Sequence, residues 1–305
     1  MSIKEVDYIW KNGELVNWEQ ANIHILTHAI HYGTGVFEGI RGYWSGDNLY
    51  VFRLEEHIDR LFESSKLYFM DPGYTKKELS EATLELLREN KIESDCYIRP
   101  LVYRGYGKIG LNPLEVPVDT AIIGFPFGKY IEAEGARCCI SSWRRIPTDV
   151  LPPESKACGN YINSVLAKVE AVKNGFDEAI FLDHDGYVSE GSGENLFIVK
   201  NNVVLTPPAY SSILIGITRD TVMKLCNEMN IKVEERPITR TELIHADEAF
   251  FSGTAAEITP IVEVDHHTIG IGDIGKVTKK LMETFHEMVR GKTLKHTDWL
   301  TPVYS

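Results

Sequence analysis

The sequence predicts a two-domain protein of the α/β class with an α+β arrangement, and three observations support this. The chain has 305 residues, which suits about two domains at roughly 100–200 residues each. Strand-like segments alternate with segments of helical periodicity in both halves. Between the halves, the stretch PFGKYIEAEGA (126–136) has glycine, proline and charge without a period. We therefore expect a domain at 1–124, a linker at 125–135 and a domain at 136–305.

The first half is expected to hold two strand pairs, two helices and two further strands. IWKNGELV predicts a hairpin closed by Asn12-Gly13, because both positions of a type I′ turn favour positive φ. GVFEGIRGYW and NLYVF predict a second pair around the turn at 45–47, and CYIRPLVY and TAIIGF are strand-like. Thr75 and Glu78 are spaced as a capping box that opens the second helix. The expected inward faces of the two helices are Leu54, Ile58, Leu61, Phe62 and Ser65, and then Leu79, Ala82 and Leu86.

The second half continues the mixed pattern. CCISSW, EAIFLD and KVEER are strand-like, and LFIVK-NN-VVLTP predicts a hairpin. Thr239 and Glu242 frame a second capping box, and a last helix from Lys276 to Arg290 ends at Gly291, a usual residue beyond a helix C-terminus. Two more helices are expected, one with Ile162, Val165, Leu166 and Val169 at helical spacing and one from near Thr218 that buries Val222, Leu225, Cys226 and Met229.

The composition excludes several classes of protein. The chain has 32 basic and 44 acidic side chains, a net charge of −12, which argues against a nucleic-acid or membrane-surface partner. No apolar run reaches the roughly 18 residues of a membrane span. The start of the chain does not resemble a signal peptide, and the five cysteines are odd in number and unpatterned. We therefore expect a cytoplasmic protein with reduced thiols.

Three motifs resemble functional sites but favour simpler interpretations. GYGKIG (105–110) matches a dinucleotide-binding fingerprint, yet Pro113 and Pro117 prevent the helix that such a site requires. His28 and His31 have no acidic third ligand nearby, so we expect no metal there. The segment 183–186 begins like a calcium loop but lacks the remaining ligands, and a turn is the simpler interpretation.

Three polar segments of the second half combine into a chemically specific set. The first is PESKACGNY, in which Lys156 has small neighbours. The second is YVSEGSGENLF, with Glu190 and Glu194 between glycines, and the third pairs GIT (216–218) with SGTAAE (252–257). A lysine for a Schiff base, an acid for a pyridine nitrogen and small residues around a phosphate are what pyridoxal 5′-phosphate (PLP) needs.

These motifs resemble the fold-type IV PLP enzymes, specifically the branched-chain amino acid aminotransferases. KACGNY, YVSEGSGENLF, GITRD and SGTAAEITP carry the resemblance, and DYIWKNGELV, HAIHYGTGVFEGIR, FRLEEHIDRL and YIRPL extend it to the first half. It implies a smaller N-terminal α/β domain and a larger C-terminal domain on a mixed, barrel-like sheet. It also implies ping-pong amino transfer between L-leucine, L-isoleucine or L-valine and 2-oxoglutarate, in branched-chain amino acid biosynthesis or degradation. The alternatives of the same fold type are a D-amino-acid transaminase, an (R)-amine transaminase and an aminodeoxychorismate lyase.

The resemblance also implies roles around the cofactor. Lys156 forms the Schiff base with PLP and moves the proton during transfer, and Glu190 faces the pyridine nitrogen. Tyr161 binds the 3′-oxygen, and Glu194 supports the site from behind. The phosphate is bound by Arg60, Ile217, Thr218 and Thr254.

The substrate residues follow from the same resemblance. The apolar and aromatic wall is implied to be Phe37, Gly39, Phe127 and Tyr130, and the polar gate Tyr97 and Arg99. Tyr32 and part of the loop 107–111 reach in from a second subunit, so a homodimer or an assembly of dimers is implied. The amides of Thr254 and Ala255 bind the α-carboxylate of the amino acid or 2-oxo acid. Arg41 aligns with a family arginine near the site, without an assigned role.

Overall fold

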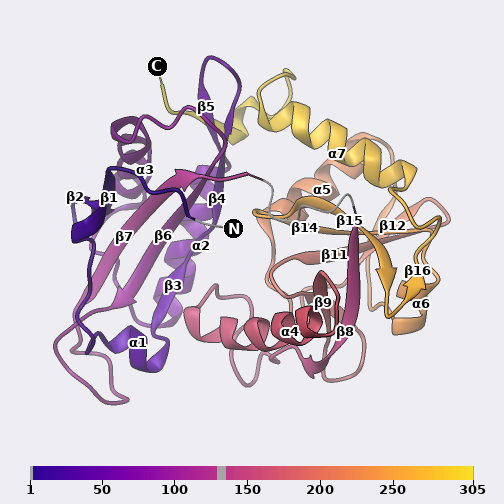
Figure 1. Cartoon of the computed structure of the whole chain (residues 1–305), viewed down its shortest axis with the longest axis horizontal. Coiled ribbons are helices and arrows are strands. Elements are labelled where there is room, and N and C mark those ends of the chain that lie inside the picture. The colour runs from indigo at the N-terminus through magenta and orange to yellow at the C-terminus, as the bar shows by residue number, and fades with distance from the viewer. Residues whose placement is uncertain (1–2, 129–134, 305) are drawn as a thin grey trace. The chain divides into compact units, whose positions relative to one another are not determined.

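The computed structural model describes residues 3–128 and 135–304, which form two compact units (Figure 1). The first unit contains the described residues up to Gly128, together with Ser155–Gly159 and the described residues from Glu287 onward. The second contains the described part of Lys129–Glu154 and Asn160–His286. Most of the expected linker at 125–135 lies outside the described residues, so that boundary stays a prediction.

The first unit is built on an eight-stranded antiparallel sheet. The strand order is β17-β5-β4-β6-β7-β1-β2, with β3 also paired to β6. The strands are β1 (Tyr8–Lys11), β2 (Glu14–Asn17), β3 (Gly35–Phe37), β4 (Ile40–Trp44), β5 (Leu49–Phe52), β6 (Cys96–Arg104), β7 (Val118–Pro126) and β17 (Leu300–Pro302). The helices are α1 (His28–Tyr32), α2 (Leu54–Leu67) and α3 (Lys76–Glu89), with short 3-10 turns at Trp18–Gln20 and Thr297–Trp299.

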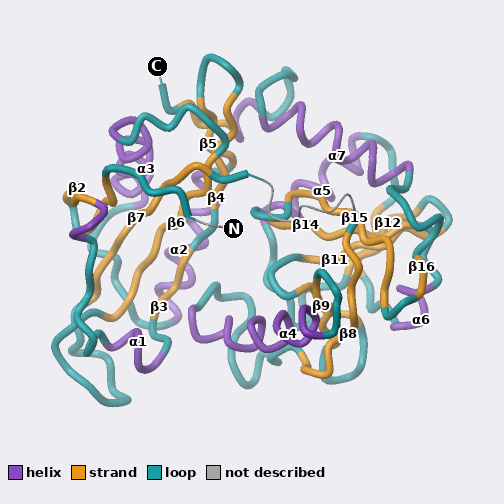
Figure 2. Tube along the Cα trace, in the orientation of Figure 1, coloured by secondary structure: helices purple, strands orange, loops and turns teal. Residues whose placement is uncertain are grey.

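Helices α2 and α3 pack against each other and against the strands of this sheet (Figure 2). Leu54, Ile58 and Leu61 of α2 are buried in the same core as Leu79 and Leu86 of α3. The expected capping box is confirmed, because Thr75 accepts from the Glu78 amide and Glu78 accepts from the Thr75 amide. The hairpin of β1 and β2 is also confirmed, with positive φ at Asn12 and Gly13.

The second unit is built on a nine-stranded mixed sheet that closes on itself. Its order is β10-β9-β8-β15-β14-β11-β12-β13, and β10 also pairs with β11, which completes the ring that the family resemblance implied. The strands are β8 (Ala136–Arg144), β9 (Glu178–Leu182), β10 (Val188–Gly191), β11 (Asn195–Lys200), β12 (Val203–Thr206), β13 (Val233–Glu235), β14 (Glu248–Gly253), β15 (Glu257–Val264) and β16 (His267–Thr268). The helices are α4 (Tyr161–Lys173), α5 (Ile217–Glu228), α6 (Arg240–Ile244) and α7 (Lys276–Val289), and a 3-10 turn at Cys158–Asn160 precedes α4.

Helix α4 buries its small residues and exposes its large ones. Ser164, Ala167 and Ala171 are buried, and α4 packs on β8 and β9 through this side. The aliphatic residues that gave the helix its periodicity lie outside the core: the exposed fractions are 64% for Ile162, 54% for Val165, 40% for Leu166 and 48% for Val169. The periodicity located the helix correctly, but its apolar side does not face the core of this unit.

No helix in the described ranges is long and apolar enough to cross a membrane.

Candidate active site

Lys156 is held in the first unit by contacts of its backbone. Its carbonyl oxygen accepts a hydrogen bond of 3.0 Å from the Phe37 amide, and its own amide donates to the Ser64 hydroxyl at 3.2 Å. Ala157 forms a bridge with Val36, so the segment lies along β3. The Lys156 side chain is half-buried, and Nζ lies 5.2 Å from the centre of the Phe37 ring. The amine is therefore held close to the region where β3 ends.

Arg60 is bound through Nε and Nη2 by the carboxylate of Glu38, a residue that the sequence analysis did not select. Glu38 follows β3 directly, and its Oε1 and Oε2 accept from Arg60 Nε at 2.7 Å and from Arg60 Nη2 at 2.8 Å. Glu38 Oε2 also lies 2.8 Å from His57 Nδ1. Burial alone would raise the pKa of the Glu38 carboxyl, but the charge of Arg60 and the hydrogen bonds of both partners outweigh it and hold this pKa well below its usual range. Glu38 is thus an anion enclosed by two bases.

Tyr97 and Arg99 form one group with the aromatic residues around them. Arg99 Nη2 donates to the Tyr97 hydroxyl at 2.7 Å, and the guanidinium lies 4.7 Å from the centre of the Phe37 ring. The Tyr97 ring is 5.3 Å from that of Phe127. Within the described residues Arg99 forms no ion pair, and it borders a cavity of about 560 Å³ that also contacts Ile9, Trp18, Ile123 and Phe125. The group offers a cation and a phenol beside aromatic side chains.

Gly39 gives this group its space. A Cβ atom at position 39 would lie 2.3 Å from the Tyr97 hydroxyl oxygen, which is much closer than van der Waals contact. Arg41 is also buried, and its Nη1 donates to the Gly128 carbonyl at 3.0 Å while its guanidinium lies 5.2 Å from the Phe127 ring. Arg41 therefore contacts the same aromatic wall. Tyr130 lies outside the described residues.

The loop after β6 is tied to α1 by a histidine. His28 is 1% exposed, and its ring nitrogens lie 2.7 Å from the Thr34 hydroxyl and 2.9 Å from the Gly110 carbonyl. The ring also lies 4.5 Å from that of Tyr32, which is 38% exposed. His28 thus has a structural role, and GYGKIG forms a loop with no helix after it, as expected from the prolines.

Glu190 in the second unit is held by an ion pair and two hydrogen bonds. Its Oε1 lies 2.8 Å from Arg145 Nε, and its Oε2 accepts from Asn195 Nδ2 and from the Leu214 amide, both at 3.1 Å. Arg145 and Asn195 were not predicted from the sequence. Asn195 lies opposite Glu190 in the β10–β11 pairing, whereas Arg145 comes from the end of β8, a non-local contact. A guanidinium at this distance favours the ionised carboxylate.

Glu194 has the opposite environment. It is 5% exposed, and its Oε2 accepts a bond of 3.1 Å from the Gly193 amide. Burial and the nearby Glu178 carboxylate raise its pKa to about 8. An added Cβ atom at Gly191 would lie 2.8 Å from Glu194 Oε2, so this glycine makes room for the carboxyl group. Glu194 therefore keeps its proton to a higher pH than an ordinary glutamate does.

The remaining predicted residues of this unit lie at one turn and at two helix starts. Ile217 and Thr218 begin α5, and the preceding Gly216 has no space for a Cβ, which would lie 2.0 Å from Asn195 Oδ1. Thr254 and Ala255 are half-buried in the turn between β14 and β15, and Tyr161 begins α4. Within the second unit, the structure thus confirms small residues and a helix N-terminus where the sequence predicted an anion site.

The donor set fits PLP. Taken unit by unit, the first holds a lysine amine and an arginine, and the second holds a carboxylate paired with Arg145 and a helix start. In the described part of the chain the buried Ser252 hydroxyl has no hydrogen-bond partner, and Ser252 lies opposite Asn195 in the β11–β14 pairing. A buried polar atom without a partner is rare, and here it indicates that a further polar group belongs beside Asn195.

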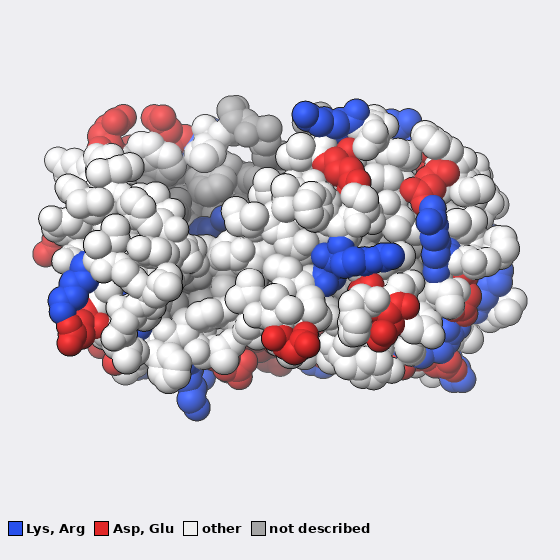
Figure 3. Space-filling model, turned by 90° about the horizontal axis from the view of Figure 1, so that it is seen from below, with Lys and Arg blue, Asp and Glu red and all other residues white. Residues whose placement is uncertain are grey.

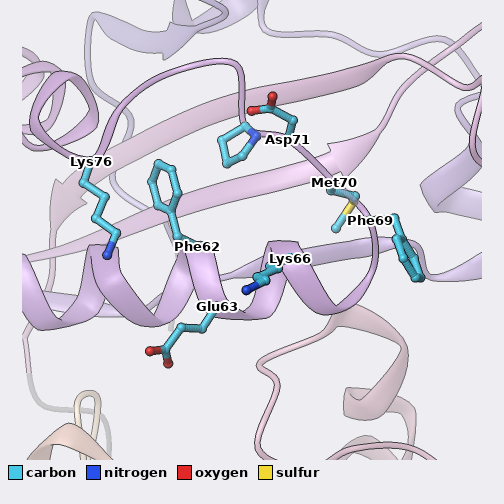
Figure 4. Close-up of a pocket in the computed structure, with 8 residues that line it drawn as sticks. Phe62, Glu63, Lys66, Phe69, Met70, Asp71 and Lys76 are labelled. Carbon is cyan, nitrogen blue, oxygen red and sulfur yellow. The ribbon is translucent and has the colours of Figure 1, made fainter.

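A larger pocket of the first unit contains none of these residues. It has a volume of about 630 Å³ and lies on the outer side of α2, where Phe62, Lys66 and Met70 line it (Figure 4). Lys76 at its rim is paired with Asp59 at 2.8 Å. His57, Arg60 and Ser64 belong to a different side of α2, so the pocket is separate from the candidate site.

The chain is similar to known aminotransferases over nearly its whole length. Residues 35–264 match the family model described as amino-transferase class IV. The probable branched-chain-amino-acid aminotransferase of Aquifex aeolicus is 46% identical, over 98% of this chain and 97% of that protein. The branched-chain-amino-acid aminotransferase of Escherichia coli is also 46% identical, over 99% of both chains.

Solved structures agree with this match. The branched-chain aminotransferase of Thermoproteus uzoniensis with norvaline has a TM-score of 0.95 and 48% identity, over 98% of this chain and all (100%) of that one. The branched-chain amino acid aminotransferase of Thermobaculum terrenum in its PLP form has a TM-score of 0.94 and 41% identity, over 98% of this chain and 99% of that one. The chain therefore belongs to the class IV aminotransferase family.

Proposed function

We propose that the protein is a branched-chain-amino-acid aminotransferase that uses PLP to exchange amino groups between L-leucine, L-isoleucine or L-valine and 2-oxoglutarate. One observation carries the substrate assignment: Arg99, which forms no ion pair within the described residues, lies with the Tyr97 hydroxyl beside aromatic side chains. A guanidinium binds the side-chain carboxylate of glutamate, and the aromatic wall accepts a branched aliphatic side chain.

The cofactor is assigned to residues of both units. Lys156 binds it covalently, Arg60 and the amides of Ile217 and Thr218 bind its phosphate, and Glu190 binds its pyridine nitrogen. Thr254 and Tyr161 would donate to its phosphate and 3′-oxygen, and Glu194 would support the site from behind. PLP bound in this way supplies an electron sink for the carbon that carries the amino group.

The protein's own groups move the proton and orient the substrate. Lys156 takes the proton from the amino acid α-carbon, which requires the neutral amine, and it returns the proton later. Glu190 is kept ionised by Arg145, and as an anion it stabilises a protonated pyridine nitrogen. The Thr254 and Ala255 amides bind the α-carboxylate, while Phe37, Gly39 and Phe127, with Tyr130, shape the space for the side chain.

The assembly and location complete the proposal. Tyr32 and the loop 107–111 are assigned to the pocket of a second subunit, so the active form is a homodimer or an assembly of dimers. The exposed aliphatic row of α4 supports an interface between copies. We assign the enzyme to the cytoplasm, where all five cysteines would remain unpaired as they are in this structure, and to branched-chain amino acid metabolism.

Reductive trapping tests the assignment of Lys156. The purified protein with PLP is expected to be yellow, and borohydride should fix the cofactor to the peptide that contains Lys156, as read by mass spectrometry. Lys156→Ala should abolish the label. Lys168→Ala is the control, because Lys168 lies in the second unit and is paired with Glu178, and this variant should keep the label. A protein that stays colourless with PLP would contradict the enzyme assignment.

A further inference from the structure

One side of α2 carries polar side chains toward the lysine segment. His57, Arg60 and Ser64 are spaced by three and four residues, which places them on one side of a helix. His57 and Ser64 are 1% and 3% exposed, and Ser64 binds the Lys156 amide. Burial of polar groups is costly unless each has a partner. The partner that His57 and Arg60 share is Glu38.

Glu38 is placed by the strand that also places Lys156. Its amide donates to the Pro100 carbonyl at 2.9 Å, and the adjacent Phe37 amide donates to the Lys156 carbonyl at 3.0 Å. The Glu38 side chain is fully buried (0% exposed), so its carboxylate has little freedom to reorient. The end of β3 thus determines both the position of the lysine segment and the direction of the Glu38 carboxylate.

The contact between Glu38 and Arg60 restricts the guanidinium to one plane. Two nearly parallel bonds join Nε and Nη2 of Arg60 to the two oxygens of Glu38. Such a two-point contact adds geometric specificity to the charge interaction. It occupies one edge of the guanidinium and directs the edge that carries Nη1 away from Glu38.

His57 restricts Glu38 from another direction. Its Nδ1 lies 2.8 Å from Glu38 Oε2, so a neutral ring with its proton on Nδ1 donates to the carboxylate. Burial lowers the pKa of His57, against the raising effect of Glu38, and the other charged groups that act on it are Arg60 and Lys156. A neutral His57 adds no positive charge beside Lys156.

We infer that Glu38 and His57 are positioning residues that hold the Arg60 guanidinium in the orientation required to bind the phosphate of the cofactor. This inference rests on the proposed function, in which Arg60 binds that phosphate. Glu38 makes the two-point contact and His57 fixes the carboxylate that makes it. Neither residue touches the reacting atoms.

The test compares PLP with pyridoxal, which has no phosphate. Glu38→Gln preserves the size of the side chain and removes its charge. We expect the preference of the apoprotein for PLP over pyridoxal, measured by fluorescence titration, to fall about tenfold or more, as when a charge-assisted hydrogen bond is weakened. An unchanged preference in a folded Glu38→Gln protein would contradict the inference.

Glu248→Gln is the matched control. Glu248 accepts from the Val277 amide at 3.0 Å and from the Thr278 amide and hydroxyl at 2.8 Å and 2.7 Å. Glu248→Gln thus removes the charge of a carboxylate that, like Glu38, accepts several hydrogen bonds, but that lies in the second unit. It is expected to lower the urea midpoint and to leave the preference for PLP unchanged.

Two variants of His57 test the donor itself. In His57→Asn the side-chain amide would place a donor near the position of Nδ1, whereas His57→Leu removes the donor. We therefore expect His57→Asn to retain the PLP preference and His57→Leu to lower it. Equal preferences in the two variants would contradict a positioning role, and this comparison remains decisive if Glu38→Gln does not fold.

A double-mutant cycle shows whether Glu38 acts through Arg60. Arg60→Lys cannot make the two-point contact. In a protein that already carries Arg60→Lys, Glu38→Gln should therefore have little further effect on the PLP preference. Additive losses would contradict the inference. A wild-type protein that takes up no PLP at Lys156 would instead contradict the proposed function, so the two failures are distinguishable.

Discussion

At the scale of the residue, the proposed function assigns to Arg99 the binding of the substrate side chain that carries a charge. Arg99→Gln retains hydrogen bonding and removes the cation, so we expect the KM for 2-oxoglutarate to rise by about tenfold or more. The KM for L-leucine, whose side chain carries no charge, should change much less. Steady-state kinetics with each substrate varied in turn measures this split, and parallel rises in both KM values would contradict the assignment.

Glu194 makes the stability of the protein depend on pH in a specific direction. Its pKa is raised from 4.5 to about 8 in the folded state, so the folded protein binds the proton more tightly than the unfolded chain. The contribution of Glu194 to the free energy of unfolding should therefore decrease as pH rises from about 4.5 to about 8. Glu194→Gln removes this contribution.

Urea unfolding of wild type and Glu194→Gln at pH 6 and pH 8.5 measures the effect. The stability of the variant relative to wild type should be greater at pH 8.5 than at pH 6. A difference between the two proteins that is independent of pH would show that Glu194 is not protonated in the folded state.

Some residues of the candidate site could be named from the sequence, and others could not. Lys156, Arg60, Glu190 and Arg99 stand in long motifs and could be named. Glu38, which binds Arg60 across 22 positions of the sequence, and Arg145, which binds Glu190 across the sheet, could not. Their roles depend on non-local pairing that residue type and spacing do not encode.

At the scale of the element, both capping boxes were predictable because they are local. Thr75→Ala should reduce the free energy of unfolding by about 1 kcal/mol, since the first turn of α3 loses the acceptor for the Glu78 amide. Thr75→Ser retains the acceptor and is the control. Chemical denaturation measures both variants, and equal losses in the two would contradict the capping interpretation.

The orientation of α4 was not predictable from its periodicity. An apolar row at helical spacing shows that a helix has an apolar side, but not whether a core or another chain covers it. Ser164, Ala167 and Ala171 are the buried residues of α4, which packs on β8 and β9, so the covered side of this helix is made of small residues that carry little hydrophobic signal.

At the scale of the whole molecule, sequence position does not decide which unit a segment joins. Ser155–Gly159 and the described residues from Glu287 onward belong to the first unit although they follow parts of the second along the chain. Strand β17 pairs with β5, and Phe37 holds the Lys156 carbonyl. These two segments join the first unit through non-local pairing, which a division of the sequence into two consecutive halves does not describe.

The exposed side of α4 supports the proposed assembly. Val165 and Val169 are 54% and 48% exposed, and a row of aliphatic side chains in water indicates an interaction site. Figure 3 shows that Lys, Arg, Asp and Glu side chains are scattered over the face seen from below the view of Figure 1, with uncharged surface between them. Val165→Asp should weaken or abolish the dimer in sedimentation velocity, whereas Ile271→Asp, at an exposed aliphatic position outside α4, should not. A wild-type monomer with full activity would contradict the assembly.

The central claim is amino transfer from branched-chain L-amino acids, and one comparison tests it most directly. The initial rate of glutamate formation from 2-oxoglutarate is measured with L-leucine and with D-alanine as the amino donor, in wild type and in Lys156→Ala. The proposed function predicts rapid transfer from L-leucine, little from D-alanine and none in the variant. Faster transfer from D-alanine than from L-leucine would contradict it.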